Sequence, residues 1–258
     1  MVEEYFKITD EFIAQYSNKQ PKWGSLGYIT YKRCVDIETP VLCDDLTWKK
    51  AGELFIGQGI IGFDDLSKQV YKSKKRYLRH GKVMDNSIEE AETMGIELEN
   101  GEILYATPDH KWLIKHDSQN HSIEWRETKD LEKNKKGSKI FLLRPFGKPW
   151  KEDNTYGGGF VSAAYDGEGN LDKISSISFC QVENGMMKKV ETILKEKQFP
   201  YTKAIKSNNA TYQYKKERQV CYSLRTHSIE NIMQFLGTYR PPRLLNKFKE
   251  NFIKRTSG

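Results

Sequence analysis

The chain has 258 residues, of which 37% are hydrophobic and 12% aromatic, so it is longer than one average domain and too rich in core-forming residues for a disordered tail. No run approaches the ~18 consecutive apolar residues of a membrane-spanning helix, and the acidic opening MVEEYFKITDEF lacks the apolar segment of a signal peptide. The net charge of +7 arises late: residues 1–150 hold 24 Lys and Arg against 24 Asp and Glu, and residues 151–258 hold 18 against 11. This asymmetry indicates either a nucleic-acid-binding half or a solvated basic face.

The first 33 residues begin with a helical pattern of apolar residues from Tyr5 to Ile13, followed by a turn-rich stretch and a short strand over residues 28–31. From residue 35 to near residue 144 the pattern changes to many short strands, separated by turn signals such as Asn100-Gly101. An all-β domain fits this part best.

A polar hinge over residues 149–156 precedes a second change of pattern. The elements expected beyond it are a helix over 157–166, a strand over 175–182, an amphipathic helix over 186–197 with Met187, Val190, Ile193 and Leu194 facing inward, strands over 201–206 and 211–225, and a helix over 228–236. Together they predict one α+β unit. The predicted fold class is therefore an all-β domain followed by an α+β domain.

The four cysteines are too widely spaced for a zinc ribbon or a disulfide framework, and none forms a CxxC pair: Cys34, Cys43, Cys180 and Cys221. We therefore expect a reducing, cytoplasmic setting and no membrane association. In that setting a special cysteine acts as a nucleophile, whereas an ordinary one is a small hydrophobic side chain.

Cys34 stands where the chain changes character, and two motifs follow it. The first, KxxxLxxG, covers residues 50–57, and the second, TPDHxxL, covers residues 107–113. Together with the segment WRETKDL at residues 125–131, they resemble the intein, or Hint, family, in which a nucleophilic cysteine opens the splicing domain. The resemblance implies an all-β splicing domain over residues 34–150.

The splicing chemistry of that family accounts for these residue types. The thiolate of Cys34 attacks the carbonyl carbon of Arg33 and converts the peptide bond into a thioester, which requires protonation of the departing nitrogen. We expect His110 to protonate that nitrogen and Thr107 to orient or polarise it. Taken singly, Cys34 is a buried small side chain and His110 a surface histidine in a turn. The two motifs, in this order and at this spacing, favour the catalytic interpretation, whereas the other three cysteines keep the ordinary one.

The C-terminal parts of an intein, a late acid and a terminal His-Asn, have no counterpart near residues 254–258. We therefore expect that the chain does not splice alone. It is then either the N-terminal piece of a split intein, which needs a separate C-terminal fragment, or a truncated relic. Residues 1–33 would be the N-extein, part of a host protein, and their sequence resembles the start of a cobalamin-dependent ribonucleotide reductase.

A second resemblance covers residues 150–250. The run YGGGFVSAAYDGEGNL at residues 156–171 is similar to the helix of LAGLIDADG homing endonucleases, with matching flanks at residues 178–184 and 235–245. Three small residues of this run share one helix face, which lets a second copy of the helix pack closely: Gly159, Ser162 and Ala163.

The endonuclease resemblance places Glu168 at the metal-binding position. A divalent ion such as Mg²⁺ held there generates a hydroxide for phosphodiester cleavage. Asp166 is a second candidate for metal binding, although its place before Glu168 suits a residue that caps or orients the turn. The alternative for both is a Gly-rich loop with surface acids. Only one such motif is present in the sequence, so paired acids require a homodimer on a near-palindromic site or a second half.

Basic and amide side chains on the strands after this helix would contact base edges and phosphates of double-stranded DNA: Lys203, Lys206, Gln213, Lys215, Lys216, Arg218 and Arg225. Taken singly, each is an ordinary solvated side chain. The sequence thus predicts an N-extein segment at residues 1–33, a splicing domain at 34–150 and a metal-dependent endonuclease domain at 151–258. The alternatives are a non-catalytic DNA-binding remnant of a decayed intein and a split-intein fragment that acts only with its partner.

Overall fold

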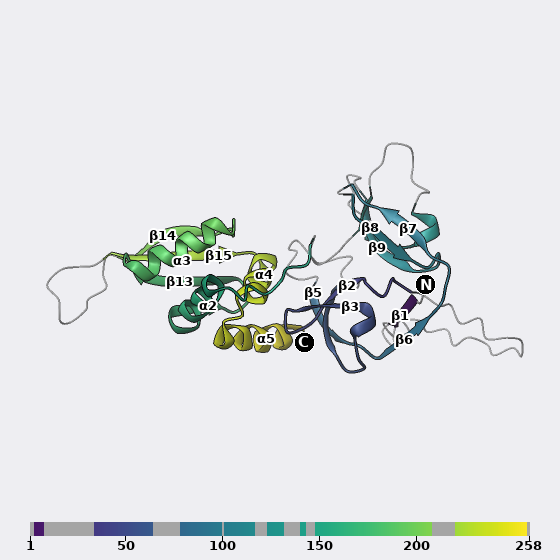
Figure 1. Cartoon of the computed structure of the whole chain (residues 1–258), viewed down its shortest axis with the longest axis horizontal. Helices are drawn as coiled ribbons and strands as arrows, with labels where there is room; N and C mark the ends of the chain where they lie inside the picture. The colour runs from purple at the N-terminus through teal and green to yellow at the C-terminus, as the bar shows by residue number, and fades with distance from the viewer. Residues whose placement is uncertain are drawn as a thin grey trace, which may run out of the picture. The chain divides into compact units, whose positions relative to one another are not determined.

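The structure is a computed structural model, and it describes residues 3–7, 34–63, 78–99, 101–116, 123–131, 140–142, 148–207 and 220–256. The chain splits into two compact units. The N-terminal unit comprises Met1–Cys43, Trp48–Lys72 and Gly81–Gly147, and the C-terminal unit comprises Asp44–Thr47, Ser73–His80 and Lys148–Gly258 (Figure 1).

The first part of the chain forms short strands. They are β1 (Glu3–Lys7), β2 (Pro40–Leu42), β3 (Trp48–Lys50), β4 (Gly59–Phe63), β5 (Leu78–Lys82), β6 (Asp85–Glu89), β7 (Met94–Glu97), β8 (Ile103–Ala106), β9 (Lys111–His116), β10 (Ile123–Glu127) and β11 (Ile140–Leu142). The pairs β1–β6, β2–β3, β4–β5 and β7–β8 form two-stranded sheets, and β10–β9–β11 form a three-stranded one. Two 3-10 turns, η1 (Ala51–Glu53) and η3 (Thr128–Asp130), follow β3 and β10.

This architecture corrects the predicted fold class. We expected an all-β splicing domain followed by an α+β endonuclease domain, and that class is wrong. The described chain is a mixed α/β protein whose strands are divided among small antiparallel sheets. The physical reason is that strands this short carry few side chains to fix their partners. Alternating strand and turn signals therefore predict strands, but they do not predict one continuous sheet.

The prediction of a helix near the N-terminus is also wrong for its first residues. Residues Glu3–Lys7 form β1, which pairs antiparallel with β6 so that Glu3 lies opposite Glu89 and Lys7 opposite Asp85. Pairing with a strand far along the chain outweighs a weak helical spacing, because tertiary context overrides local propensity. The rest of that predicted helix and the strand predicted over residues 28–31 lie outside the described residues.

The C-terminal unit contains most of the helical residues. Its elements are α2 (Tyr156–Glu168), β12 (Gly169–Asp172), β13 (Ser176–Val182), α3 (Gly185–Glu196), β14 (Thr202–Ser207), β15 (Cys221–His227), α4 (Ile229–Tyr239) and α5 (Pro242–Thr256). The strands form one sheet in the order β12-β13-β15-β14, and all neighbours in it are antiparallel. The predicted α2, β13, α3, β14 and α4 are found within a few residues of their expected bounds, whereas β12 and α5 were not predicted.

Side-chain caps explain where three of these helices begin. The oxygen of each cap accepts a hydrogen bond from a backbone N–H of the first turn: Thr155 from Gly158 at 3.2 Å, Asn184 from Met187 at 2.9 Å and Ser228 from Asn231 at 3.2 Å. The prolines at 241 and 242 separate α4 from α5, because proline is tolerated only in the first turn of a helix. Along the described segments, no helix is both long and apolar enough to cross a membrane.

The turn 44–47 belongs to the C-terminal unit through a set of hydrogen bonds and ion pairs. The indole N–H of Trp150 donates to the carbonyl of Leu46 at 3.0 Å, and Arg240 Nη1 donates to the carbonyl of Asp45 at 3.1 Å. Lys249 Nζ lies 3.2 Å from Asp44 Oδ2, and Leu46 is fully buried. These contacts satisfy the main-chain carbonyls of a turn that would otherwise face solvent.

The sheet of the C-terminal unit has two unlike faces. Phe179 and Leu224 are fully buried on one face, where the ring of Tyr165 from α2 lies 5.4 Å from that of Phe179 and 4.5 Å from that of Phe235 in α4. Residues opposed in an antiparallel sheet share a face. The other face, termed the polar face, therefore carries Ser178, Cys180, Thr202, Ala204, Ser223 and Arg225.

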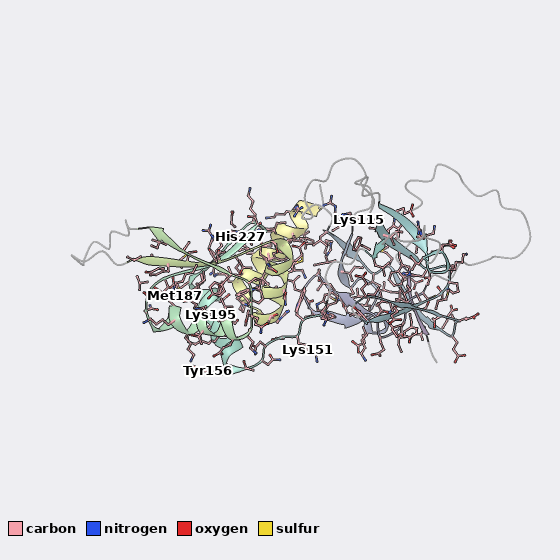
Figure 2. The ribbon with its side chains drawn as sticks, turned by 90° about the horizontal axis from the view of Figure 1, so that it is seen from above. Lys115, Lys151, Tyr156, Met187, Lys195 and His227 are labelled. Carbon is pink, nitrogen blue, oxygen red and sulfur yellow. The ribbon has the colours of Figure 1, made fainter. Side chains whose placement is uncertain are left out.

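Helix α3 covers the apolar face near β14. Its buried side chains include Met187 (Figure 2), and Glu191 is only 14% exposed. Glu191 accepts hydrogen bonds from Lys203 Nζ at 2.8 Å and from the hydroxyl of Tyr201 at 3.1 Å. The hydrogen bond from Lys203 holds the pKa of Glu191 below its ordinary value, against the raising effect of burial.

Replacing Glu191 with glutamine should lower the free energy of unfolding near neutral pH by ~1 kcal/mol, because the charge that holds Lys203 is lost. The folded-state pKa of Glu191 is depressed, so its stabilisation is present above the ordinary value of 4.5 and is lost as the pH falls through the lower folded value. Urea titrations should therefore show the difference between wild type and Glu191→Gln shrinking as the pH falls below 4.5. The exposed Glu196→Gln is the matched control, and a difference independent of pH would contradict this role.

Candidate functional site

The main chain at Cys34 is paired with the end of β8. The N–H of Cys34 donates to the side-chain hydroxyl of Thr107 at 3.0 Å, and the N–H of Thr107 donates to the carbonyl of Cys34 at 3.0 Å. The pairing continues through a bridge between Val35 and Ala106. Cys34 is 1% exposed and Thr107 is 4% exposed, so both lie in a protected environment.

A tight turn follows Thr107 and carries His110. Pro108 stands at its second position, where the fixed φ of proline favours a turn, and the N–H of His110 donates to the carbonyl of Thr107 at 3.1 Å. The start of η3 holds this turn from outside: Thr128 N–H donates to the carbonyl of His110 at 2.9 Å, and Lys129 N–H donates to that of Pro108 at 3.0 Å. The sequence from 107 to 110 thus holds both predicted residues beside β8.

This arrangement places the predicted splicing residues Cys34, Thr107 and His110 in one region of the N-terminal unit. Thr107 contacts the amide nitrogen of Cys34 directly, and His110 lies in the turn that begins at Thr107. A hydroxyl that accepts from this N–H restrains the amide nitrogen of Cys34. The other buried cysteine of the N-terminal unit, Cys43, packs in an apolar cluster with Leu54, Ile60 and Val83.

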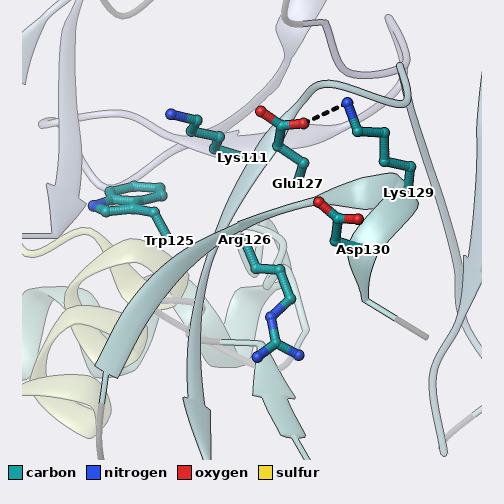
Figure 3. Close-up of a pocket in the computed structure, with 6 residues that line it drawn as sticks. All are labelled: Lys111, Trp125, Arg126, Glu127, Lys129 and Asp130. Carbon is teal, nitrogen blue, oxygen red and sulfur yellow. Dashed lines mark ion pairs between the residues drawn. The ribbon is translucent and has the colours of Figure 1, made fainter. Parts of the chain in front are cut away.

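An open polar pocket adjoins the same turn. Its volume is about 750 Å³, and it is lined by Lys111, Trp125, Arg126, Glu127, Lys129 and Asp130 (Figure 3). An ion pair crosses it, with Lys129 Nζ 2.7 Å from Glu127 Oε2. The hydrogen bond from Lys129 lowers the pKa of Glu127, and the same bond raises the pKa of Lys129. The predicted segment WRETKDL therefore supplies most of this pocket, which no sequence pattern predicted.

The two acids at the end of α2 have different environments. Glu168 is the last residue of α2 and is exposed. Asp166 Oδ1 accepts a hydrogen bond from the backbone N–H of Arg243 at 2.6 Å, in the first turn of α5. Asp166 therefore caps the start of α5, a helix that the sequence did not predict.

The side chain of Arg243 also joins these two helix ends, from α5 back to α2. Its guanidinium donates to the carbonyls of Asp166 at 2.6 Å, Gly169 at 2.8 Å and Tyr165 at 3.3 Å, all at the C-terminal end of α2. A cation is favoured there, because the last carbonyls of a helix carry partial negative charge. Each helix end thus satisfies backbone groups of the other, and these bonds restrain the backbone on both sides of Glu168.

Glu168 and Asp166 differ in how well they suit a magnesium ion. Mg²⁺ keeps several waters and takes one or two carboxylates together with phosphate oxygens, so an exposed Glu168 suits it. Asp166 suits it less, because one of its oxygens caps α5. Among the described residues, no group of three or more His, Cys, Asp or Glu is placed to hold a metal ion.

The predicted DNA-contacting residues are divided by the structure. Lys203 lies on the apolar, helix-covered side of the sheet, where its Nζ is 2.8 Å from Glu191 and 3.8 Å from Glu183. Arg225 is exposed on the polar face, and Lys206 lies in β14. The structure therefore does not bring Lys203 and Arg225 to one face. The other predicted residues lie outside the described part of the chain: Gln213, Lys215, Lys216 and Arg218.

Sequence reasoning missed the residues that hold these sites in place. Arg243 appeared only within the flank at residues 235–245, and the signal that could have found it is an arginine directly after two prolines at a helix start. No family model matches the chain, and no curated protein is similar enough to count as a relative.

Replacing Arg243 with methionine, which keeps most of the side-chain volume, should lower the free energy of unfolding by about 2 kcal/mol, because three carbonyls lose a charged donor. Arg243→Lys should recover less than half of this, since an ammonium cannot span three carbonyls in a fork. Asp166→Asn should change stability by less than ~1 kcal/mol, because the amide oxygen still accepts from the N–H of Arg243. Urea titration monitored by circular dichroism measures all three, and equal losses for the two Arg243 variants and Asp166→Asn would contradict the cap.

Proposed function

We propose that the chain carries the first step of intein-type protein splicing, an acyl shift at the peptide bond between Arg33 and Cys34. The observation that carries the proposal is the 3.0 Å hydrogen bond from the N–H of Cys34 to the hydroxyl of Thr107. Any buried N–H needs an acceptor, and here the acceptor is a side-chain hydroxyl at a position where a main-chain carbonyl would complete the pairing with β8. A hydroxyl can rotate to follow the nitrogen as that nitrogen becomes a leaving group.

The proposed reaction is an isomerisation that needs no oxidant or reductant. The thiol of Cys34 loses its proton, and the sulfur forms a bond to the carbonyl carbon of Arg33. The bond from that carbon to the Cys34 nitrogen then breaks, and the nitrogen takes up a proton to leave as a free amine. The products are a thioester to residue 33 and a new amino group at residue 34, so atoms and charge balance.

Two side chains support this reaction in separate ways. The hydroxyl of Thr107 holds the nitrogen and twists or polarises the amide as its resonance is lost. The imidazole of His110 donates the proton to the departing nitrogen, which matters because an amide anion is too poor a leaving group. The reaction requires Cys34 as a thiol, and Cys34 is not part of a disulfide. A cytoplasmic location would suit this chemistry.

Thiols or hydroxylamine should cleave the chain after Arg33, since both attack a thioester much faster than an amide. Cys34→Ala should abolish this cleavage, and Thr107→Val and His110→Ala should slow it by ~10²-fold or more. Mass spectrometry of the released fragment 1–33 measures the rate.

The matched control is Cys43→Ala, which removes an equally buried thiol outside the turn and should leave cleavage after Arg33 in place. Release of fragment 1–33 from the Cys34→Ala variant would overturn the assignment of the nucleophile.

A second function, metal-dependent endonuclease cleavage of double-stranded DNA, is favoured by the exposed side of α2. Gly159, Ala163 and Gly167 are exposed and four residues apart, so they lie on one side of the helix. A side chain at Gly159 or Gly167 would meet no other atom within 4 Å. Small residues of this kind let another helix approach closely, and Glu168 directly follows Gly167, the last residue of the stripe.

In this proposal Glu168 holds a divalent metal ion near the scissile phosphate, and Arg243 and Asp166 fix the helix end that presents it. The metal ion supplies a polarised water and charge stabilisation when bound. A second copy of α2, from a homodimer or a separate half, supplies the second acid. Arg225 on the polar face and the basic excess of the C-terminal part supply attraction to phosphates. The two alternatives to this function are a DNA-binding remnant that no longer cuts DNA and a split-intein fragment that acts only with its partner.

Glu168→Gln keeps nearly the shape of the side chain but removes the charge that attracts a metal ion. DNA binding in a gel-shift assay should survive, whereas strand cleavage in magnesium should fall by ~10³-fold or more. Asp166→Asn should reduce cleavage only partly. The substrate is DNA that encodes residues 1–33 joined directly to the host sequence beyond the insertion.

Glu196→Gln, at the exposed end of α3, is the matched control and should cut like wild type. Equal cleavage by wild type and Glu168→Gln would show that another residue holds the metal. If wild type and Glu168→Gln both bind DNA tightly and neither cleaves it, the chain is instead a non-catalytic DNA-binding remnant.

A further inference from the structure

Trp112 lies between two parts of the proposed splicing site. Its side chain packs against the apolar cluster that contains Val35 and Ala106. Val35 directly follows Cys34 and Ala106 directly precedes Thr107, so the cluster adjoins that pair along the paired segments. The indole of Trp112 also meets the imidazole of His110, with ring centroids 4.7 Å apart and planes inclined at 66°. One ring thus contacts both the proposed proton donor and the cluster next to the Cys34–Thr107 pair.

Thr128 fixes this indole from the neighbouring strand. The N–H of Trp112 donates to the hydroxyl of Thr128 at 3.0 Å, and Thr128 is only 3% exposed. The same hydroxyl lies 3.3 Å from the carbonyl of His110, to which it donates, and the main-chain N–H of Thr128 donates to that carbonyl at 2.9 Å. Thr128 therefore connects the indole and the backbone of the histidine through three hydrogen bonds.

The register of β9 and β10 explains why these three residues meet. Glu127 lies opposite Lys111, so the next residues outward, Thr128 and His110, continue the ladder. Opposed residues share a face, and residues two apart on one strand also share it. His110, Trp112 and Thr128 therefore lie on the same face of this hairpin, next to the turn that starts at Thr107.

We propose that Trp112 and Thr128 are positioning residues for His110 in the acyl shift, an inference that rests on the proposed splicing function. Trp112 sets the separation between the imidazole and the Cys34–Thr107 pair, and Thr128 sets the rotation of the indole. Both act through His110: Trp112 through its contact with the imidazole, and Thr128 through its hydrogen bonds to the indole and to the backbone of His110. Their effect is geometric, and a displacement of about 1 Å in such a site costs ~10²-fold in rate.

A purely structural role for the same pair makes a different prediction. A buried hydroxyl that only satisfies an indole N–H would affect folding stability by ~1 kcal/mol and leave the rate of the folded protein unchanged. A positioning role affects the rate at saturating trapping reagent, when the acyl shift itself limits cleavage. The two readings are therefore separated by measuring rate and stability on the same variants.

The experiment follows release of fragment 1–33 from the full chain in saturating hydroxylamine across a range of pH. Thr128→Val is isosteric and removes only the hydroxyl, and Trp112→Phe keeps an aromatic ring but removes the N–H. Each should lower the saturated rate by ~10-fold or more. Thr128→Ser restores the hydroxyl and should recover the rate to within ~3-fold of wild type.

Thr226→Val is the matched control. Thr226 is 1% exposed in the C-terminal unit, and its hydroxyl donates to the carbonyl of Pro200 at 3.0 Å. Its loss removes an equivalent buried hydrogen bond and should leave the cleavage rate unchanged, while urea titrations show a comparable loss of stability.

The outcomes separate the inference from the function on which it rests. Wild type that releases no fragment 1–33 would overturn the splicing proposal and the positioning role together. Wild type that cleaves, with Thr128→Val and Trp112→Phe cleaving as fast, would overturn the positioning role alone. A slow Thr128→Val that Thr128→Ser fails to rescue would also overturn it, since the hydroxyl would then not be the group that acts.

Discussion

The pairing of the chain at Cys34 with the end of β8 is the contact on which the geometry of the proposed splicing site depends. It joins residues 73 apart in the sequence, so it closes a long loop whose entropic cost grows only with the logarithm of its length. Consecutive contacts from residue 34 to residue 36 support it, and a side-chain hydroxyl takes the place that a main-chain carbonyl would occupy in an ordinary ladder. The pairing therefore continues to Cys34, the proposed nucleophile, but its last acceptor is a side-chain hydroxyl, which can rotate while the main chain stays in place. The turn with His110 and the hairpin with Thr128 are then placed by short-range bonds.

The C-terminal unit is built on one antiparallel sheet whose two faces carry different side chains. Burial of aromatic rings from α2 and α4 on one face of the sheet leaves the other face to small polar side chains. The basic excess of this part is not all available to a partner, because Lys203 is held by Glu191 beneath α3. Attraction to nucleic acid would depend on cations such as Arg225, whose side chain is exposed on the polar face.

Local signals were enough to predict several elements, and long-range partners were not. The spacing of Met187, Val190 and Leu194 predicted α3 and its buried face, because helix periodicity acts over neighbouring turns. Motif order predicted that Cys34 and Thr107 belong to one site, but nothing local predicted a direct hydrogen bond between them. Alternation on β14 gave no sign of which face Lys203 would take, since that depends on the register with β15. The all-β expectation failed for the same reason: short strands do not carry the information that selects their partners.

The hydrogen bond at the Cys34 nitrogen also bears on reversibility. If the acyl shift occurs, the peptide bond that breaks lies just outside the pairing with β8, so the rest of that pairing can remain folded around the products. The liberated amine would then stay beside Thr107 and the thioester, at an effective concentration far above that of any amine in solution. Because an amide is more stable than a thioester, the pair would return to the peptide many times before an external nucleophile captured it. The resting protein would accordingly be an intact chain, with the reactive isomer as a minor species drawn off by whatever acceptor reaches it first.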